Sequence, residues 1–161
     1  MPVPLFASSL EPYAARLTEK LGEVLRGGRY ILGPEVAAFE REYADYLGVR
    51  HCVGVANGTE AITIALRALG VQPGDEVVCP SFTFYATVEA TVNAGASPVF
   101  CDIDPETFCV TPETVRAALT PRTKALLPVH LFGNLAPVPE LRELGLPVLE
   151  DAAQALSLIH I

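Results

Sequence analysis

The stretch Pro147-Val148-Leu149-Glu150-Asp151-Ala152-Ala153-Gln154-Ala155 decides the fold. Its apolar beginning predicts a short buried strand, which runs into two carboxylates and then into small residues that suit the opening of a helix. In open α/β sheets, ligands bind at the carboxyl ends of the strands. An acid at that place needs a partner of opposite charge or a set of hydrogen bonds. Asp151 is therefore interpreted either as the partner of a cationic group, such as a protonated pyridine nitrogen, or as a cap for the following turn.

Short apolar runs alternate with helical patterns from His51 onward. This rhythm predicts crossover connections, and hence an α/β fold with a mostly parallel sheet between two layers of helices, a three-layer α/β/α arrangement. The predicted strands are 52–56, 76–79, 98–103, 124–129 and 147–149, and the predicted helices are 59–69, 85–93, 112–119 and 138–144. Before them, helical spacing over 12–26 and 35–47 predicts an N-terminal helical arm over residues 1–50, with a break at 30–34.

The overall composition excludes several classes of protein. The chain has 19 acidic and 11 basic residues and a net charge of −8, which argues against a nucleic-acid-binding protein. No apolar run has the length of a membrane span, and no leader pattern opens the chain. Cys52, Cys79, Cys101 and Cys109 have neither zinc-ligand nor C-x-x-C spacing, so we expect free thiols and a cytoplasmic protein without a metal site.

Asn57-Gly58-Thr59-Glu60 joins a predicted strand to a predicted helix. A glycine lets the main chain approach a ligand, the helix start offers free N–H groups, and the threonine adds a hydroxyl. These features predict a phosphate site, although neither the nucleotide-binding loop nor the dinucleotide fingerprint is present. An ordinary glycine turn is the alternative.

Aromatic residues follow the strand 76–79, at Phe82, Phe84 and Tyr85. An aromatic ring at the carboxyl end of a strand can stack on a heteroaromatic ligand. The alternative is that these rings belong to the core, which we favour for Phe82.

Two further groups could carry chemistry. His130 ends the strand 124–129 on the same edge as Asp151, where it could act on a ligand, but a structural histidine is favoured. Asp102, Asp104 and Glu106 resemble a metal cluster, yet the proline between them indicates a solvent-exposed turn.

Together these motifs closely resemble the DegT/DnrJ/EryC1/StrS sugar aminotransferases, which are pyridoxal-phosphate enzymes of fold type I. The resemblance covers nearly all of residues 5–155 and is carried, in order, by Y-I-L-G-P-E-V at 30–36, A-N-G-T-E-A at 56–61, G-D-E-V at 74–77, F-T-F at 82–84, G-A-S-P-V-F at 95–100, D-I-D at 102–104, T-P-R-T-K-A at 120–125, P-V-H at 128–130 and E-D-A-A-Q-A at 150–155.

The resemblance implies a role for individual residues. Gly58 and Thr59 match positions that bind the phosphate of pyridoxal 5'-phosphate, and Phe84 matches the aromatic residue stacked on its ring. Asp151 matches the aspartate paired with the ring nitrogen, and Gln154 matches the residue beside the phenolic oxygen. This pairing favours the ligand interpretation of Asp151 over a cap alone.

One essential residue of the family has no match. The family's Schiff-base lysine follows the D-A-A-Q motif by a few tens of residues. Lys20 lies on the N-terminal arm and Lys124 opens a strand at the opposite end of the sheet, so we expect neither to reach the ring. We therefore expect this polypeptide not to transaminate, a prediction that turnover by the purified chain would refute.

The resemblance also implies a domain plan. Residues 51–155 would be part of the large cofactor-binding domain, truncated and without the small domain. Residues 156–161 are expected to be a non-native tail, because the resemblance ends at Ala155 and L-S-L-I-H-I is what read-through of a common sequencing-adaptor end would encode.

The resemblance implies that the parent protein is a transferase acting in sugar, polysaccharide or secondary-metabolite biosynthesis. It would move an amino group from an amino acid, expected to be glutamate, to a keto group of a nucleotide-activated sugar, and it would work as a homodimer. Two alternatives stay open: a pyridoxal-phosphate-dependent sugar dehydratase with histidine in place of the lysine, and a non-catalytic module that binds the cofactor or a sugar nucleotide.

Overall fold

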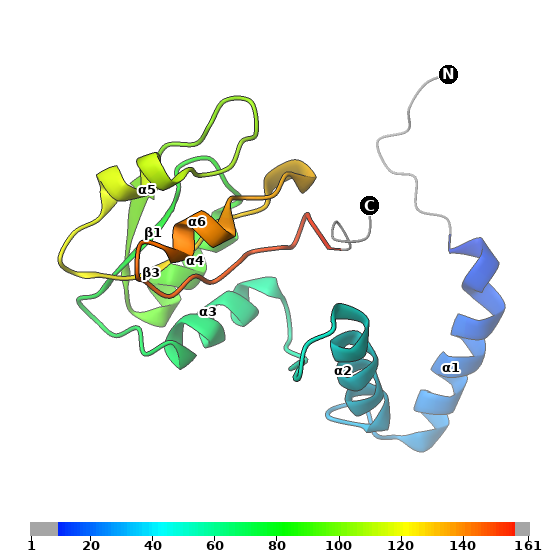
Figure 1. The fold of residues 1–161 in the computed structure, drawn as a ribbon. Helices are drawn as coiled ribbons and strands as arrows, with labels where there is room; N and C mark the ends of the chain where they lie inside the picture. The colour runs from blue at the N-terminus through cyan, green and yellow to red at the C-terminus, as the bar shows by residue number, and fades with distance from the viewer. Residues whose placement is uncertain (1–9, 157–161) are drawn as a thin grey trace. The chain divides into compact units, whose positions relative to one another are not determined.

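A computed structural model describes residues 10–156 of the 161-residue chain. The chain divides between Gly54 and Val55 into two compact units, which are described separately (Figure 1). The prediction of a non-native tail over 156–161 falls, except for Leu156, outside the described residues.

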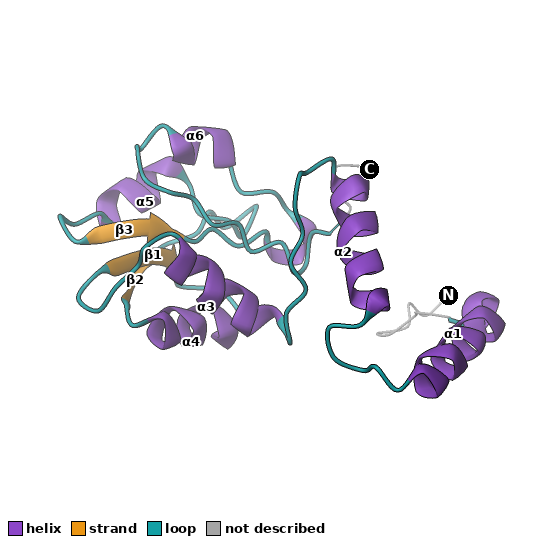
Figure 2. Ribbon diagram, turned by 90° about the horizontal axis from the view of Figure 1, so that it is seen from below, coloured by secondary structure: helices purple, strands orange, loops and turns teal. Residues whose placement is uncertain are grey.

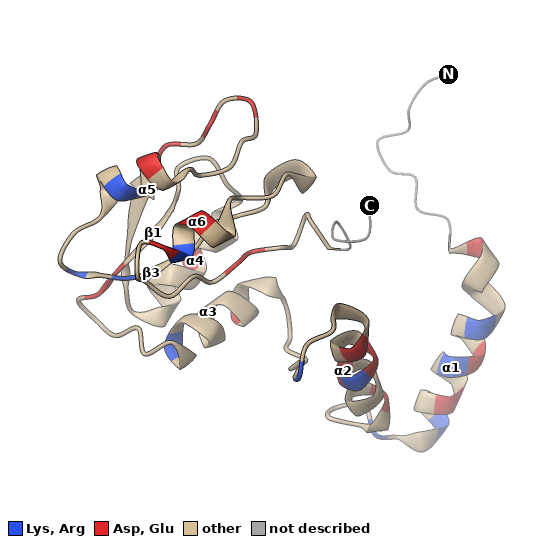
Figure 3. Ribbon diagram, in the orientation of Figure 1, with Lys and Arg blue, Asp and Glu red and all other residues tan. Residues whose placement is uncertain are grey.

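The first unit consists of helices. It contains the 3-10 turn η1 (Glu11–Tyr13), α1 (Ala14–Gly27) and α2 (Pro34–Leu47). Both α-helices end where the sequence predicted, at Gly28 and Gly48, whose φ angles of 65° and 66° glycine adopts without strain. Lys20 bridges Glu23 and Glu35 at 3.0 and 3.4 Å. Acidic and basic residues are interspersed along both helices (Figure 3).

The second unit holds a three-stranded parallel sheet in the order β2-β1-β3. Its elements are α3 (Gly58–Ala68), β1 (Glu76–Pro80), α4 (Tyr85–Ala94), β2 (Ser97–Cys101), α5 (Pro112–Ala118), β3 (Thr123–Leu126), the 3-10 turn η2 (Leu131–Gly133) and α6 (Val138–Arg142). The predicted alternation of strands and helices is confirmed from α3 to α6, with boundaries within a few residues of those expected.

Helices cover both faces of this sheet. Val77 and Cys79 of β1 pack into one apolar cluster with α3 and α4, while Val78 packs into a second cluster with α5 and α6. Figure 2 shows the same division, with α3 and α4 on one side of the strands and α5 and α6 on the other. Because both faces are buried, β1 is apolar at successive positions rather than at alternate ones. The three-layer α/β/α prediction is confirmed.

The predicted strand at 147–149 forms an interrupted ladder beside β3. Parallel bridges join Leu126 to Val148 and Val129 to Asp151. Hydrogen bonds run from Leu126 N–H to Pro147 O and from Leu149 N–H to Leu126 O, both 2.9 Å. The next donor, two residues after the end of β3, would be residue 128. It is a proline and has no N–H, so the ladder breaks there. The absence of a continuous strand therefore follows from Pro128.

The predicted strand at 52–56 is wrong. Residues 51–55 have no regular secondary structure, and no ladder partner for them is found among residues 10–156. Val53 and Val55 leave 75% and 40% of their surface exposed. An alternating apolar run becomes a strand only where another strand supplies hydrogen bonds, so the pattern alone was insufficient.

Three of the four cysteines are buried, and all four are free thiols. Burial raises the pKa of the Cys79 thiol to about 12 and that of Cys101 to about 11. Within the described residues, no helix combines the length and the apolar character needed to cross a membrane.

Candidate functional site

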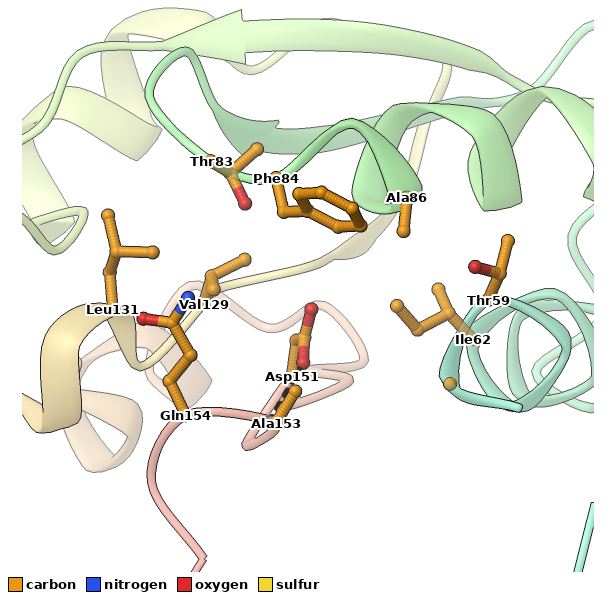
Figure 4. Close-up of a pocket in the computed structure, with 11 residues that line it drawn as sticks. Thr59, Ile62, Thr83, Phe84, Ala86, Val129, Leu131, Asp151, Ala153 and Gln154 are labelled. Atoms are coloured by element: carbon orange, nitrogen blue, oxygen red, sulfur yellow. Dashed lines mark hydrogen bonds between the residues drawn. The ribbon is translucent and has the colours of Figure 1, made fainter. Parts of the chain in front are cut away.

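A pocket of about 250 Å³ opens at the carboxyl-terminal edge of the sheet in the second unit. Four segments meet there: the start of α3, the turn between β1 and α4, the chain after β3, and the stretch that follows the last bridge (Figure 4). Its lining is mostly apolar, with a few polar groups, and consists of Gly58, Thr59, Ile62, Thr83, Phe84, Ala86, Val129, Leu131, Asp151, Ala153 and Gln154. All five residues that the sequence nominated as cofactor ligands are in this set.

The start of α3 forms one end of the pocket. Asn57 caps the helix, since its side-chain oxygen accepts the Glu60 N–H at 2.9 Å and its carbonyl accepts the Ala61 N–H at 3.0 Å. The N–H groups of Gly58 and Thr59 then have no acceptor in the described part of the chain. They point out of the positive end of an 11-residue helix, which favours an anion.

Gly58 has a specific environment that explains its residue type. A Cβ atom placed on it would meet no protein atom within 4 Å, and its φ angle is not positive. Neither crowding within the protein nor backbone conformation therefore demands glycine here. Gly58 lines the pocket, so glycine at this position lets a ligand approach the main chain closely.

Asp151 is held at the pocket by its main chain. Its N–H donates to Pro128 O, and its carbonyl accepts from His130 N–H, both at 3.0 Å. Its carboxylate oxygen Oδ1 accepts the Ala153 N–H at 3.1 Å. Asp151 thus does cap the following turn, and its second oxygen has no hydrogen-bond donor within residues 10–156. A fixed carboxylate with one uncommitted oxygen can pair with a cation in the pocket.

Phe84 lies across the pocket from Asp151 (Figure 4). It immediately precedes α4, and its side chain is 73% exposed. The neighbouring Thr83 and Thr87 hydroxyls share a hydrogen bond of 2.9 Å, which fixes the turn that carries the ring. An exposed aromatic face on a fixed turn can stack on a flat ring.

Gln154 supplies the last predicted group. Its Oε1 accepts the Phe132 N–H at 2.7 Å. Since a main-chain N–H can only donate, the amide oxygen must face Phe132, and the NH₂ group is left as the donor toward the pocket. Figure 4 shows the nitrogen on the side of Val129 and the oxygen on the side of Leu131.

His130 does not line the pocket. It is 3% exposed, and its ring contacts the Ala136 N–H and the Glu150 carboxylate. The favoured interpretation as a structural histidine agrees with this placement.

Two other predictions have clear outcomes. Placing Phe82 in the core is wrong, because its side chain is 50% exposed and packs against Phe108 and Phe132 in a surface cluster. The turn at Asp104 is as expected, because Oδ1 accepts the N–H groups of Glu106 and Thr107 at 3.0 and 2.8 Å. These bonds lower the pKa of the Asp104 carboxyl, with the Thr107 amide contributing most.

Sequence reasoning missed several lining residues, notably Ile62, Thr83, Val129 and Leu131. Val129 and Thr83 adjoin predicted site residues, so their proximity could have been inferred from the strand ends. Leu131 could not, because it lies on the 3-10 turn η2, which was not predicted from the sequence.

Comparison with known proteins places this site in context. The sequence profile of the DegT/DnrJ/EryC1/StrS aminotransferase family matches residues 13–160. A UDP-2-acetamido-2-deoxy-3-oxo-D-glucuronate aminotransferase from Pseudomonas aeruginosa is 47% identical over 154 residues, which are 91% of this chain and 43% of that protein.

Solved structures are similar in fold as well as in sequence. DesV of S. venezuelae superposes with a TM-score of 0.88 at 46% identity, over 91% of this chain and 40% of that one. NtdA from Bacillus subtilis, solved with bound cofactor PMP, gives a TM-score of 0.87 at 39% identity, over 91% and 34%. The chain spans less than half of the length of each of these relatives. It belongs to the DegT/DnrJ/EryC1/StrS aminotransferase family.

Proposed function

We propose that the pocket binds pyridoxal 5'-phosphate. The observation that carries this proposal is the convergence of four complementary groups on one cavity of about 250 Å³. An anion seat, an exposed aromatic face, a carboxylate and an amide NH₂ come from three segments of the chain, at 58–59, 84 and 151–154. A phosphorylated, protonated pyridine with a phenolic oxygen presents a matching group to each.

Each residue would have a distinct task toward the cofactor. The N–H groups of Gly58 and Thr59 would hold the phosphate, and Phe84 would cover one face of the ring. Asp151 would keep the proton on the ring nitrogen, because a carboxylate beside a protonated nitrogen favours its charged form. Gln154 would donate to the phenolic oxygen. The bound cofactor supplies an electron sink for bonds next to an amino group.

For the whole protein we propose a sugar aminotransferase. It would move an amino group from an amino acid, with glutamate the expected donor, to a keto group of a nucleotide-activated sugar. The relative that acts on a UDP-linked 3-oxo sugar acid supports this substrate class. No lysine is among the residues that line the pocket, so the covalent partner of the cofactor is expected from sequence that the longer relatives contain.

The same proposal extends to organisation. Residues 51–155 would be the cofactor-binding part of a larger domain, residues 1–50 an arm, and residues 156–161 a non-native tail. A cytoplasmic homodimer is proposed, with no part in nucleic-acid binding. Tyr30 and Ile31, which are 62% and 83% exposed, support a subunit interface. The free buried thiols support a reducing compartment.

Calorimetric titration of the chain tests the proposed ligand. We expect pyridoxal 5'-phosphate to bind, and pyridoxal, which lacks the phosphate, to bind at least tenfold more weakly, since several charge-assisted hydrogen bonds would be lost. Equal affinity for the two compounds would contradict a phosphate seat at α3. Absence of binding by either compound would contradict the proposed function.

A further inference from the structure

The buried His130 is hydrogen-bonded through its ring and its main chain, and two residues further along the chain the Phe132 N–H is hydrogen-bonded to the Gln154 amide. We propose that His130 is a positioning residue, which acts through Phe132 to set the direction in which Gln154 offers its NH₂ group. The inference rests on the proposed function for the identity of the ligand. The contacts themselves hold without any ligand.

The ring of His130 connects two segments. Its Nδ1 accepts the Ala136 N–H at 3.0 Å, so in the neutral ring the proton is on Nε2. Nε2 lies 3.2 Å from Glu150 Oε2 and donates to it. Glu150 is itself 3.4 Å from the Arg142 guanidinium, the other charged group near this contact. The side chain thus ties the loop at 131–136 to the segment that carries Asp151.

The main chain of His130 adds a third link. Its N–H donates to Asp151 O at 3.0 Å, directly beside the first residue of η2. The loop is therefore fixed at its start by the His130 main chain and at its end by the His130 ring. A loop fixed at both ends can hold an unusual conformation between them.

Phe132 has that unusual conformation. Its φ of 54° lies in the left-handed region, which residues other than glycine and asparagine rarely adopt. Its ring packs edge-on against the Phe108 ring, with 5.3 Å between the ring centroids, and also packs against the Phe82 ring, with 6.3 Å between the centroids. The ring contacts explain why phenylalanine is present rather than glycine. The left-handed turn directs the Phe132 N–H at Gln154 Oε1, 2.7 Å away.

The chemical consequence concerns selectivity. With Oε1 engaged, Gln154 offers the pocket a donor and no acceptor. It would favour a ligand with an acceptor at this position, such as an ionised phenolic oxygen. A ligand with a hydroxyl that must donate, or with a hydrogen atom in place of the oxygen, would bind less well. A glutamine free to rotate would offer either group. His130 therefore contributes to ligand choice although it touches no ligand.

The first experiment needs no ligand. Amide hydrogen exchange of Phe132 is measured by NMR in the wild-type chain and in His130→Leu, His130→Asn and Gln154→Leu. Asparagine places an acceptor where Nδ1 lies and so preserves the Ala136 bond, while leucine removes it. We expect Gln154→Leu and His130→Leu to lose about fivefold of the protection at Phe132, and His130→Asn to keep most of it. If His130→Leu fails to fold, the test rests on Gln154→Leu and on a comparison of His130→Asn with His130→Gln. Glutamine restores only the hydrogen bond on the Nε2 side of the ring.

The second experiment measures the effect of His130 on ligand binding. Affinities are measured for pyridoxal 5'-phosphate and for its analogue without the phenolic oxygen. We expect His130→Leu to weaken the first about fivefold and to leave the second unchanged. Equal weakening of both, or unchanged Phe132 exchange in a folded His130→Leu, would overturn the proposal. If the wild-type chain binds neither compound, the proposed function fails, while the exchange result still decides whether His130 positions Gln154.

Discussion

Asp151 Oδ1 accepts a hydrogen bond from the Ala153 main-chain N–H at 3.1 Å, on the rim of the pocket. From the sequence, capping and ligand binding were competing interpretations of this aspartate. The structure shows that the cap is made by one oxygen and leaves the other toward the pocket. Capping also prevents rotation of the carboxylate, so the two roles support each other.

Replacing Gly58 should separate ligand binding from stability. We predict that Gly58→Ala weakens pyridoxal 5'-phosphate binding at least tenfold, because the added methyl group would meet no protein atom and would stand on a residue that lines the proposed ligand site. The fold should be unaffected or slightly more stable, by about 0.5 kcal/mol, since alanine favours a helix. Calorimetry and urea unfolding measure the two effects.

Gly145→Ala is the matched control in the same unit. Gly145 has φ 78°, so alanine is strained there, and we expect a loss of about 1 kcal/mol of stability with little change in affinity. If Gly58→Ala behaved like this control, the space beside Gly58 would have no role in ligand binding.

The cysteines should differ in reactivity. Burial raises the pKa of Cys79 to about 12 and that of Cys101 to about 11, and it also raises the pKa of Cys109. At about pH 8 the thiolate fraction of Cys79 is then on the order of 10⁻⁴. We predict that Ellman's reagent modifies Cys52 in the native chain and all four cysteines in denaturant. Rapid native modification of Cys79 would show that this core opens readily.

Glu76 should make stability depend on pH. Its buried carboxylate accepts hydrogen bonds from the Thr120 hydroxyl and the Arg122 guanidinium, which lower its pKa from the ordinary 4.5. A lowered pKa means that the carboxylate stabilises the fold above about pH 4.5 and loses this effect as the pH falls through the folded-state pKa.

The corresponding variant is Glu76→Gln, which resembles the protonated acid. We predict that it destabilises the chain at about pH 7 and by less at about pH 3, as measured by urea unfolding at both pH values. A loss of the same size at both would mean that charge is not the stabilising feature. Lys20→Gln supplies a control, because the ion pairs of Lys20 with Glu23 and Glu35 are on the surface and we expect their loss to change stability little.

The sequence was informative where local pattern and burial agree. The apolar β1, buried on both faces, and the helices that end at glycine were predictable from residue type alone. Phe84 and Asp151 could be placed at one edge because the carboxyl ends of parallel strands lie together, whereas Gly58 was assigned to that edge through a strand at 52–56 that the structure does not have. The proximity of Phe84 and Asp151 therefore followed from topology.

The remaining features depend on contacts between distant residues. The run at 52–56 has the pattern of a strand, but pattern cannot supply a ladder partner. Phe82 was predicted to be a core residue because it is aromatic. The local sequence does not show that Phe108 and Phe132 pack against it on the surface. The left-handed Phe132 depends on the anchoring of its loop by His130, which no local motif encodes.

The most direct test of the proposed cofactor site compares Asp151→Asn with Asp151→Ala. Asparagine can still accept the Ala153 N–H and so preserves the turn, but it has no charge for a ring nitrogen; alanine loses both. We predict that Asp151→Asn keeps the wild-type unfolding midpoint and binds pyridoxal 5'-phosphate about 10- to 100-fold more weakly, the effect of losing one hydrogen bond to a charged group. Wild-type affinity in a folded Asp151→Asn chain would contradict the assignment of this pocket to the cofactor.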